Sequence, residues 1–105
     1  MKIAYQGISG SYSESCAKLI YPKSETIPCK TFDECFEKAN LDKDIKTLIP
    51  ESNKTTGNIG VEYLIFKYRL NVYAEHFFPI KHNLLGLPGS NIKDIKDVYS
   101  HAQAL

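Results

Sequence analysis

The first half of the chain combines short runs of strand-forming residues with longer stretches of helical periodicity. Residues 2–6 have the alternating pattern of a strand, and residues 25–29 and 45–49 are further short runs that contain branched side chains. These three runs predict β-strands. Because two helical stretches separate them, we expect a parallel, doubly wound α/β sheet with right-handed crossovers.

Two helices are predicted between these strands. Ser11 with Glu14, and Thr31 with Glu34, have the spacing of a capping box, in which a hydroxyl side chain begins a helix. Apolar side chains then recur along one helical face. They are Cys16, Leu19 and Ile20 in the first helix, and Phe32, Cys35, Phe36 and Ala39 in the second. Pro22 ends the first helix, because proline cannot continue it.

A polar stretch after the third strand leads into a third predicted helix. Pro50 ends the strand because it has no N–H, and residues 51–60 are rich in Ser, Asn, Thr and Gly. Apolar residues at helical spacing then predict a helix from Val61 to about Arg69. The stretch is thus expected at the carboxyl end of a strand and beside a helix amino end, where anionic ligands bind in α/β proteins. An ordinary polar loop with an N-cap is the alternative.

We expect these strands and helices to share one core. Its predicted members are Ile3, Ile27, Leu48, Val61, Leu64 and Ile65, with Phe32 and Phe36 on the same side of the sheet as one helix. Cys16 and Cys35 lie on apolar helix faces, so we expect core residues there rather than nucleophiles. His76 and His82 lie on extended runs, where we expect ordinary packing roles.

The rest of the chain loses this helical periodicity. Residues 70–78 and 82–87 are extended runs separated by a proline, and we expect them to cross out of the first sheet. One or two helical turns are predicted within 91–97, and a short strand at 98–100. Residues 101–105 have the pattern of a helix that has just begun, and we therefore expect a longer protein.

The break at Pro79 divides the chain into two parts. We expect residues 1–77 to form a first α/β lobe, and residues 78–105 to form the crossover and the start of a second, incomplete lobe. A length of 105 residues limits the chain to one domain at most.

Composition and charge exclude several classes of function. The chain has 13 basic and 12 acidic side chains and a net charge of +1, so it has no field that attracts nucleic acid or a membrane surface. Its 3 cysteines lack CxxC spacing, which argues against a disulfide framework and a zinc site. We expect a cytoplasmic protein, because no apolar signal segment follows Met1.

Three separated stretches resemble one known family, the prephenate dehydratases. The run Tyr5-Gln-Gly7 with Gly10-Ser-Tyr-Ser13 is similar to the family's opening strand, glycine turn and helix start. Residues 50–57 resemble its Pro-Ile-Glu-Asn-Ser-Thr-Ala-Gly loop, and residues 98–105 are close to its Tyr-Ser-His-Pro-Gln-Ala-Leu motif. The resemblance covers residues 2–105.

The departures of this sequence from the family motifs include Ser52, Lys54 and Ala102. Ser52 stands where the family has Glu, Lys54 where it has Ser, and Ala102 where it has Pro. Lys54 adds a cation beside the expected cleft, so a charge contact would replace a hydrogen bond to a substrate carboxylate. Lys54 therefore bears on the choice between prephenate and the related substrate arogenate.

The resemblance implies an enzyme of phenylalanine biosynthesis that converts prephenate to phenylpyruvate, water and carbon dioxide. It also implies two α/β lobes around a cleft, in the manner of type II periplasmic binding proteins, and no metal or organic cofactor. We expect prephenate as the small-molecule partner and a homo-oligomer such as a dimer. The family's Thr-Arg-Phe motif, with its important threonine, does not occur in these 105 residues. We therefore expect the chain alone to be inactive.

The resemblance also assigns candidate substrate-binding residues. They are Ser11, Tyr12, Asn53, Lys54, Thr55, Ser100, His101 and Gln103. Plainer roles stand beside these assignments: Ser11 as an N-cap only, and Tyr12 as a packing residue between lobes. His101 could act as a general acid, since the reference pKa of histidine is about 6.5, or as a structural imidazole.

Two other functions remain open at this point. One is a non-catalytic module that holds a small carboxylate on the same scaffold, and the other is a fragment whose only behaviour is association. A reading frame that continues beyond Leu105 into a Thr-Arg-Phe motif would distinguish the enzyme from both.

Overall fold

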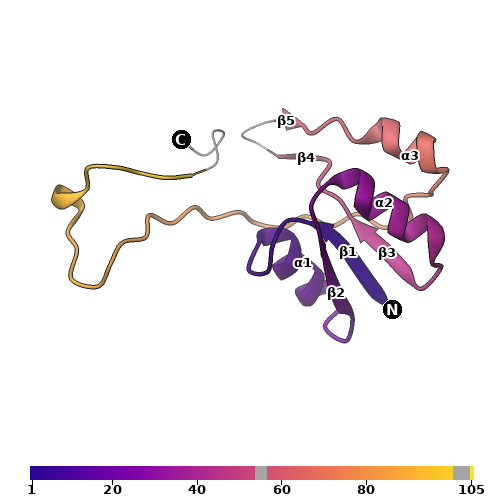
Figure 1. The fold of residues 1–105 in the computed structure, drawn as a ribbon, viewed down its shortest axis with the longest axis horizontal. Coiled ribbons are helices and arrows are strands. Elements are labelled where there is room, and N and C mark those ends of the chain that lie inside the picture. The colour runs from indigo at the N-terminus through magenta and orange to yellow at the C-terminus, as the bar shows by residue number, and fades with distance from the viewer. Residues whose placement is uncertain (54–56, 101–104) are drawn as a thin grey trace.

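The computed structural model describes residues 1–53, 57–100 and 105 (Figure 1). Its first elements are β1 (Lys2–Gln6), α1 (Tyr12–Ile20), β2 (Glu25–Cys29), α2 (Phe32–Leu41) and β3 (Ile45–Leu48). The later elements are β4 (Ser52–Asn53), β5 (Gly57–Asn58), α3 (Glu62–Tyr68) and a short 3-10 helix, Ile92–Asp94. The three strands and three helices predicted in the first two thirds of the chain are thereby confirmed.

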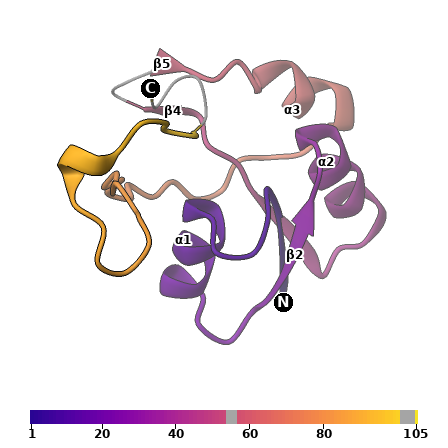
Figure 2. The same ribbon diagram turned by 60° about the vertical axis from the view of Figure 1, so that its left-hand side comes forward.

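The three longer strands form one parallel sheet in the order β2-β1-β3. Ala4 of β1 is in register with Ile27 of β2 and Thr47 of β3. The sheet lies between α1 and α2, which cover its opposite faces (Figure 1 and Figure 2). Parallel pairing with a helix on each face confirms the predicted doubly wound α/β arrangement for this part of the chain.

The predicted single core is wrong, because the sheet buries both of its faces. Successive side chains of a strand point to opposite faces, so Ile3 and Ala4 of β1 cannot share one. Ala4 belongs to a cluster beneath α2, with Ile27 packed against it. Ile3 therefore lies on the face covered by α1, and so does Leu48, which is in register with Tyr5.

A second cluster joins α2 to α3. Phe36, Val61 and Leu64 are its buried members, and Phe32 and Ile65 pack against them. Phe32 and Phe36 therefore share one side of the sheet, as predicted. The third helix lies on α2 as an outer layer and not directly on the sheet.

The apolar face predicted for the first helix is partly wrong. Cys16 is buried, but Leu19 is 71% exposed. Glu14 and Ala17 are buried in its place. Since each helical residue turns by about 100°, an inward face centred between Cys16 and Glu14 carries Leu19 to the outside.

Residues 71–100 run out beyond α1 (Figure 1). They contain no strand, so the strand predicted at 98–100 is wrong, whereas Ile92–Asp94 confirms the helical turn predicted within 91–97. The radius of gyration is 16.2 Å, although a compact domain of this length has about 13 Å. No helix in the described residues is long and apolar enough to cross a membrane.

Candidate functional site

The carboxyl edge of the sheet brings the ends of β1 and β3 together. In a sheet of order β2-β1-β3 the topological switch point lies between β1 and β3, and α/β proteins bind ligands in the crevice at such a point. The turn of residues 7–10 follows β1, and the polar stretch that begins at Pro50 follows β3. Both stretches singled out in the sequence thus leave the sheet at one edge.

Two glycines shape the turn between β1 and α1. Gly7 has φ 132° and Gly10 has φ 90°, conformations that residues with a side chain rarely adopt. The Gly7 N–H donates to the Cys29 carbonyl at 2.9 Å, and the Ser11 N–H donates to the Ile8 carbonyl at 3.2 Å. A Cβ on Gly7 would also lie 3.4 Å from Ser11 Oγ. The turn is therefore tight, and it delivers Ser11 to the start of α1.

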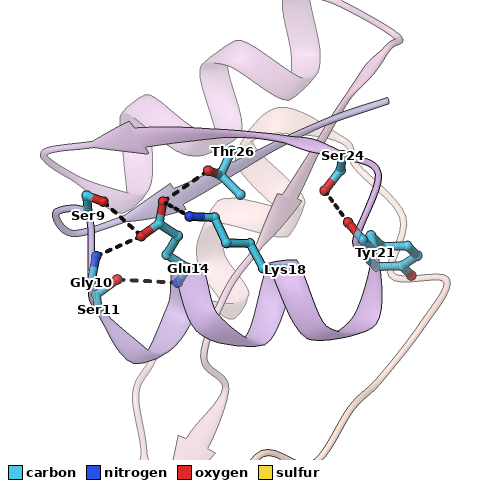
Figure 3. A network of polar contacts seen from close by, with 8 residues as sticks. All are labelled: Ser9, Gly10, Ser11, Glu14, Lys18, Tyr21, Ser24 and Thr26. Carbon is cyan, nitrogen blue, oxygen red and sulfur yellow. Dashed lines mark hydrogen bonds and ion pairs between the residues drawn. The ribbon is translucent and has the colours of Figure 1, made fainter.

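Glu14 holds this turn from within α1 (Figure 3). Its Oε2 accepts hydrogen bonds from Ser9 Oγ at 3.0 Å and from the Gly10 N–H at 2.7 Å. Its Oε1 accepts a hydrogen bond from Thr26 Oγ1 at 3.1 Å and pairs with Lys18 Nζ at 2.9 Å. The Gly10 N–H, followed by Lys18, lowers the pKa of Glu14 to about 2. The carboxylate is therefore ionised at neutral pH, although Glu14 is only 7% exposed.

The hydroxyl of Tyr12 is engaged by the segment that follows Pro79. It donates to the Lys81 carbonyl and accepts from the Lys81 N–H at 3.1 Å. The Tyr12 ring contacts Phe78 edge-on, with ring centroids 6.3 Å apart. At the other end of α1, Tyr21 contacts His76 in the same way at 6.0 Å. This segment thus lies along α1, and the packing role expected for His76 is observed. A place for Tyr12 between two lobes stays a prediction.

The structure describes the side chains of Ser11, Tyr12 and Ser100 among the candidate binding residues. Ser11 is the N-cap of α1, and its Oγ accepts from the Glu14 N–H at 3.3 Å. Ser100 lines a cavity of about 740 Å³ whose lining residues all lie between 82 and 105. The structure thus brings Ser11 and Tyr12 together at one turn. Lys54, Thr55, His101, Gln103 and the side chain of Asn53 lie outside the described residues, so the single cleft stays a prediction.

The polar stretch after β3 forms an antiparallel pair at its described ends. Asn53 of β4 is in register with Gly57 of β5, and the Ile59 N–H donates to the Glu51 carbonyl at 2.7 Å. The following helix, α3, has 7 residues, and its N-cap, Val61, makes no side-chain capping bond. Binding of an anionic ligand at this helix stays a prediction.

The cysteines are core residues. Cys16, Cys29 and Cys35 are free and buried. Burial raises the pKa of each thiol, and that of Cys35 to about 12. Because the thiolate is the nucleophilic form, these thiols are poor nucleophiles at neutral pH. The core roles predicted for Cys16 and Cys35 are confirmed.

Sequence reasoning missed the inward position of Glu14 and its contact with Thr26. It treated Glu14 only as the partner of the Ser11 cap. A usable signal was Lys18, four residues further on, because Glu and Lys at that spacing pair along one side of a helix. The hydrogen bond to Thr26 depends on how α1 lies on the sheet, and no local pattern predicts it.

Comparisons with known proteins cover the whole chain. It is 41% identical over 106 residues to arogenate dehydratase/prephenate dehydratase 1, chloroplastic, of Arabidopsis thaliana, and 40% identical over 106 residues to arogenate dehydratase 2 of Petunia hybrida. Each alignment covers 100% of this chain and 27% of the relative. The chain thus spans about a quarter of the length of these curated relatives. No solved structure matches the chain.

The family model described as prephenate dehydratase matches residues 3–105. These residues include the glycine turn, the polar stretch after β3 and the final motif, on which the resemblance was based. The chain therefore belongs to the prephenate dehydratase family.

Proposed function

We propose that the protein containing this chain is a prephenate dehydratase, which converts prephenate to phenylpyruvate with loss of water and carbon dioxide. The observation that carries the proposal is the family match over residues 3–105. The tight turn at the switch point supports it, because hydroxyl and N–H groups at such an edge suit an anionic substrate. Prephenate, with two carboxylates, is a substrate of that kind.

The reaction requires a substrate held in the reacting orientation and one proton for the departing hydroxyl. The bond from the ring to its carboxylate breaks, carbon dioxide leaves, and the released electron pair completes the aromatic ring as the ring hydroxyl departs. A proton delivered to that hydroxyl gives water. Positioned donors can supply both needs. Ser11 is our candidate donor at the turn, and His101, outside the described residues, stays a candidate acid.

Arogenate is the second candidate substrate. The relatives in Arabidopsis and Petunia carry arogenate dehydratase in their names. Arogenate has an amino group where prephenate has a keto group, so its net negative charge is smaller. A site with few cations would bind arogenate better than prephenate. The charge of Lys54 would then decide between the two substrates.

We further propose the two-lobed, periplasmic-binding-protein-like fold, with residues 1–77 in the first lobe and 78–105 at the start of the second. Residues 71–100 contain no strand and therefore belong to neither sheet, which supports their assignment to a second lobe. A cytoplasmic location and a homo-oligomer, such as a dimer, also stay proposals.

The 105-residue chain alone should not turn over prephenate at a useful rate. It contains no Thr-Arg-Phe motif, and an incomplete second lobe would leave the reacting groups poorly placed. The test is to express both this chain and the complete gene product, supply prephenate or arogenate, and follow phenylpyruvate and phenylalanine. Binding of prephenate by the complete product without turnover would favour a non-catalytic carboxylate-binding module instead.

A pair of serine variants tests the turn in the complete gene product. Ser11→Ala removes the hydroxyl at the candidate site, whereas Ser24→Ala removes one that donates to the Tyr21 carbonyl at the far end of α1 (Figure 3). We expect Ser11→Ala to lower kcat/KM by about tenfold or more, as expected for loss of a substrate hydrogen bond of ~1.4 kcal/mol. Equal values for the two variants would argue against a site at this turn.

A further inference from the structure

We propose that Glu14 is a positioning residue, which fixes the turn of residues 7–10 so that neighbouring donors receive a carboxylate of the substrate. This inference rests on the proposed function, because it assigns a role within that reaction. Glu14 is the buried charged residue of the described chain. A buried carboxylate is costly unless hydrogen bonds satisfy it, and both oxygens of Glu14 are satisfied by two partners each.

The bonds of Glu14 go further than helix capping requires. In an ordinary capping box the glutamate accepts from the N–H of the N-cap residue itself. Here the N-cap is Ser11, whose N–H donates to the Ile8 carbonyl. Glu14 instead accepts from Gly10, the residue before the N-cap, and also from the hydroxyl of Ser9, one residue deeper in the turn. It therefore immobilises the turn as well as the helix end.

Thr26 connects the same carboxylate to the sheet. Its hydroxyl donates to Oε1 of Glu14 from β2, the strand beside β1. The turn is thus held to two elements at once, to α1 through the backbone and to β2 through Glu14. Such a turn keeps its donors in place before a substrate arrives, which lowers the entropy lost on binding.

The backbone N–H groups that have no acceptor indicate how this turn would bind a substrate carboxylate. The Gly10 N–H, the Ser11 N–H and the Glu14 N–H all have acceptors. Among the described residues the N–H groups of Tyr12 and Ser13, which begin α1, have no acceptor. An ionised carboxylate so close to them would repel an anion, but the ion pair with Lys18 offsets its charge. The Glu14–Lys18 pair thus stiffens the turn at little electrostatic cost to substrate binding.

The second helix provides a matched control. Glu34 accepts from the Lys30 N–H at 2.8 Å, and its own N–H donates to the Thr31 hydroxyl at 3.1 Å. This arrangement repeats that of Glu14 at the start of α2, without the buried setting or the bonds to a glycine turn. Glu34→Gln therefore reports the loss of the bond to the residue before the N-cap, which both glutamates make, without the bonds from Ser9 and Thr26 that Glu14 alone receives.

The test compares the steady-state kinetics of Glu14→Gln, Glu34→Gln and the unchanged gene product with prephenate and arogenate. Loss of a group that holds the substrate-binding donors in place weakens the binding of the ground state and of the transition state alike. KM therefore rises and kcat changes little. We expect the KM of Glu14→Gln to rise by roughly tenfold, with kcat within about twofold. Glu34→Gln should keep both constants. A merely structural role would lower the active fraction, and thus kcat, at unchanged KM.

Thr26→Val is the second variant, because Glu14→Gln could fail to fold. It keeps the branched shape of the side chain and removes only the hydroxyl that donates to Glu14. A KM about threefold higher than that of the unchanged protein supports the inference, and an unchanged KM in every folded variant overturns it. If the unchanged protein turns over neither substrate, the proposed function fails and this inference falls with it; if it does turn over substrate, only the variants decide.

Discussion

The hydroxyl of Tyr12 bonds to both polar groups of the Lys81 main chain, although these residues lie 69 positions apart. Tyr12 directly follows the N-cap of α1, and Lys81 lies in the segment that runs along α1 and on beyond it. The start of the helix at the candidate site is therefore bonded to this segment. Any movement of residues after Lys81 relative to the sheet would be transmitted to this helix end.

Tyr12→Phe should loosen the segment around Lys81 while leaving the sheet and its helices folded. The variant loses both bonds to Lys81 but keeps the ring that contacts Phe78. Bonds of this kind contribute about 0.5–1.5 kcal/mol each, so the segment should open several-fold more often. The measurement is the initial rate of tryptic cleavage after Lys81 under native conditions. Tyr63→Phe, on an exposed ring, is the control. Equal cleavage rates of the two variants would show that the Tyr12 hydroxyl does not hold the Lys81 main chain.

Acid should weaken the α/β part of the chain, which holds β1 to α3, through Glu14. Its folded pKa, about 2, lies below the value of about 4.3 for an unfolded glutamate. Its stabilising contribution is thus fully present above the unfolded pKa and is lost as pH falls from about 5 through the folded pKa. Urea unfolding measured between these limits should show a steeper loss of stability for the unchanged protein than for Glu14→Gln. Parallel curves would contradict the depressed pKa.

Local patterns were sufficient to predict β1, β2, β3, the three α-helices and the caps of α1 and α2. Ser11 and Thr31 cap their helices as expected, because a capping box is contained within four residues. Patterns did not show which sheet face each strand residue occupies, and so Ile3 was assigned to the wrong cluster. Whether residues of two neighbouring strands share a face depends on how the strands are aligned. The hydrophobic pattern within each strand does not determine that alignment.

The candidate site was predicted only in part, for a related reason. The glycine turn was visible as a motif, and Ser11 was assigned both a capping and a binding role. The contacts of Glu14 with Thr26, and of Tyr12 with Lys81, join residues 12 and 69 positions apart. Such contacts arise from tertiary packing, and no propensity of the residues themselves encodes them.

Leu64→Ala should severely destabilise the α/β part of the chain. Leu64 is fully buried and packs with Phe36 and Val61 between α2 and α3. Truncation of a buried leucine removes transfer free energy and leaves a cavity, at a cost of about 2–5 kcal/mol. Phe66→Ala, on the exposed side of the same helix, should change stability by no more than about 0.5 kcal/mol. Chemical unfolding of both variants measures the contrast, and similar losses would show that the helix is oriented differently.

Tyr5→Phe should leave the protein as stable or make it more stable. Tyr5 is fully buried, and its hydroxyl has no hydrogen-bond partner among the described residues. Removing a buried, unpaired hydroxyl relieves a desolvation cost of about 1–3 kcal/mol. Tyr68→Phe is the opposite case, because that hydroxyl donates to Asp33 at 3.0 Å, and it should lose stability. Thermal unfolding of the pair tests the sign, and a clear loss for Tyr5→Phe would mean that its hydroxyl is satisfied in solution.

The 105-residue chain, expressed by itself, should self-associate. It exposes 8506 Å², whereas a folded monomer of 11.9 kDa is expected to expose roughly 6,000 Å². Part of the excess is apolar, since Leu84, Leu85, Leu87 and Leu105 are all exposed. A stable pairing of two proteins buries about 1,200–2,000 Å² in total, which is less than the excess that a single chain carries.

Light scattering over a range of concentrations measures this association, and the variant Leu85→Ser with Leu87→Ser shows whether the leucines cause it. These two side chains are 88% and 82% exposed, so polar replacements should leave the sheet and its helices intact. Association that weakens in the double variant supports an apolar contact through residues 82–105. The serines remove apolar surface whose burial favours association. Association that is unchanged in the variant would place the contact elsewhere. A monomer at the highest concentration would mean that residues 71–100 fold back and cover their own apolar side chains.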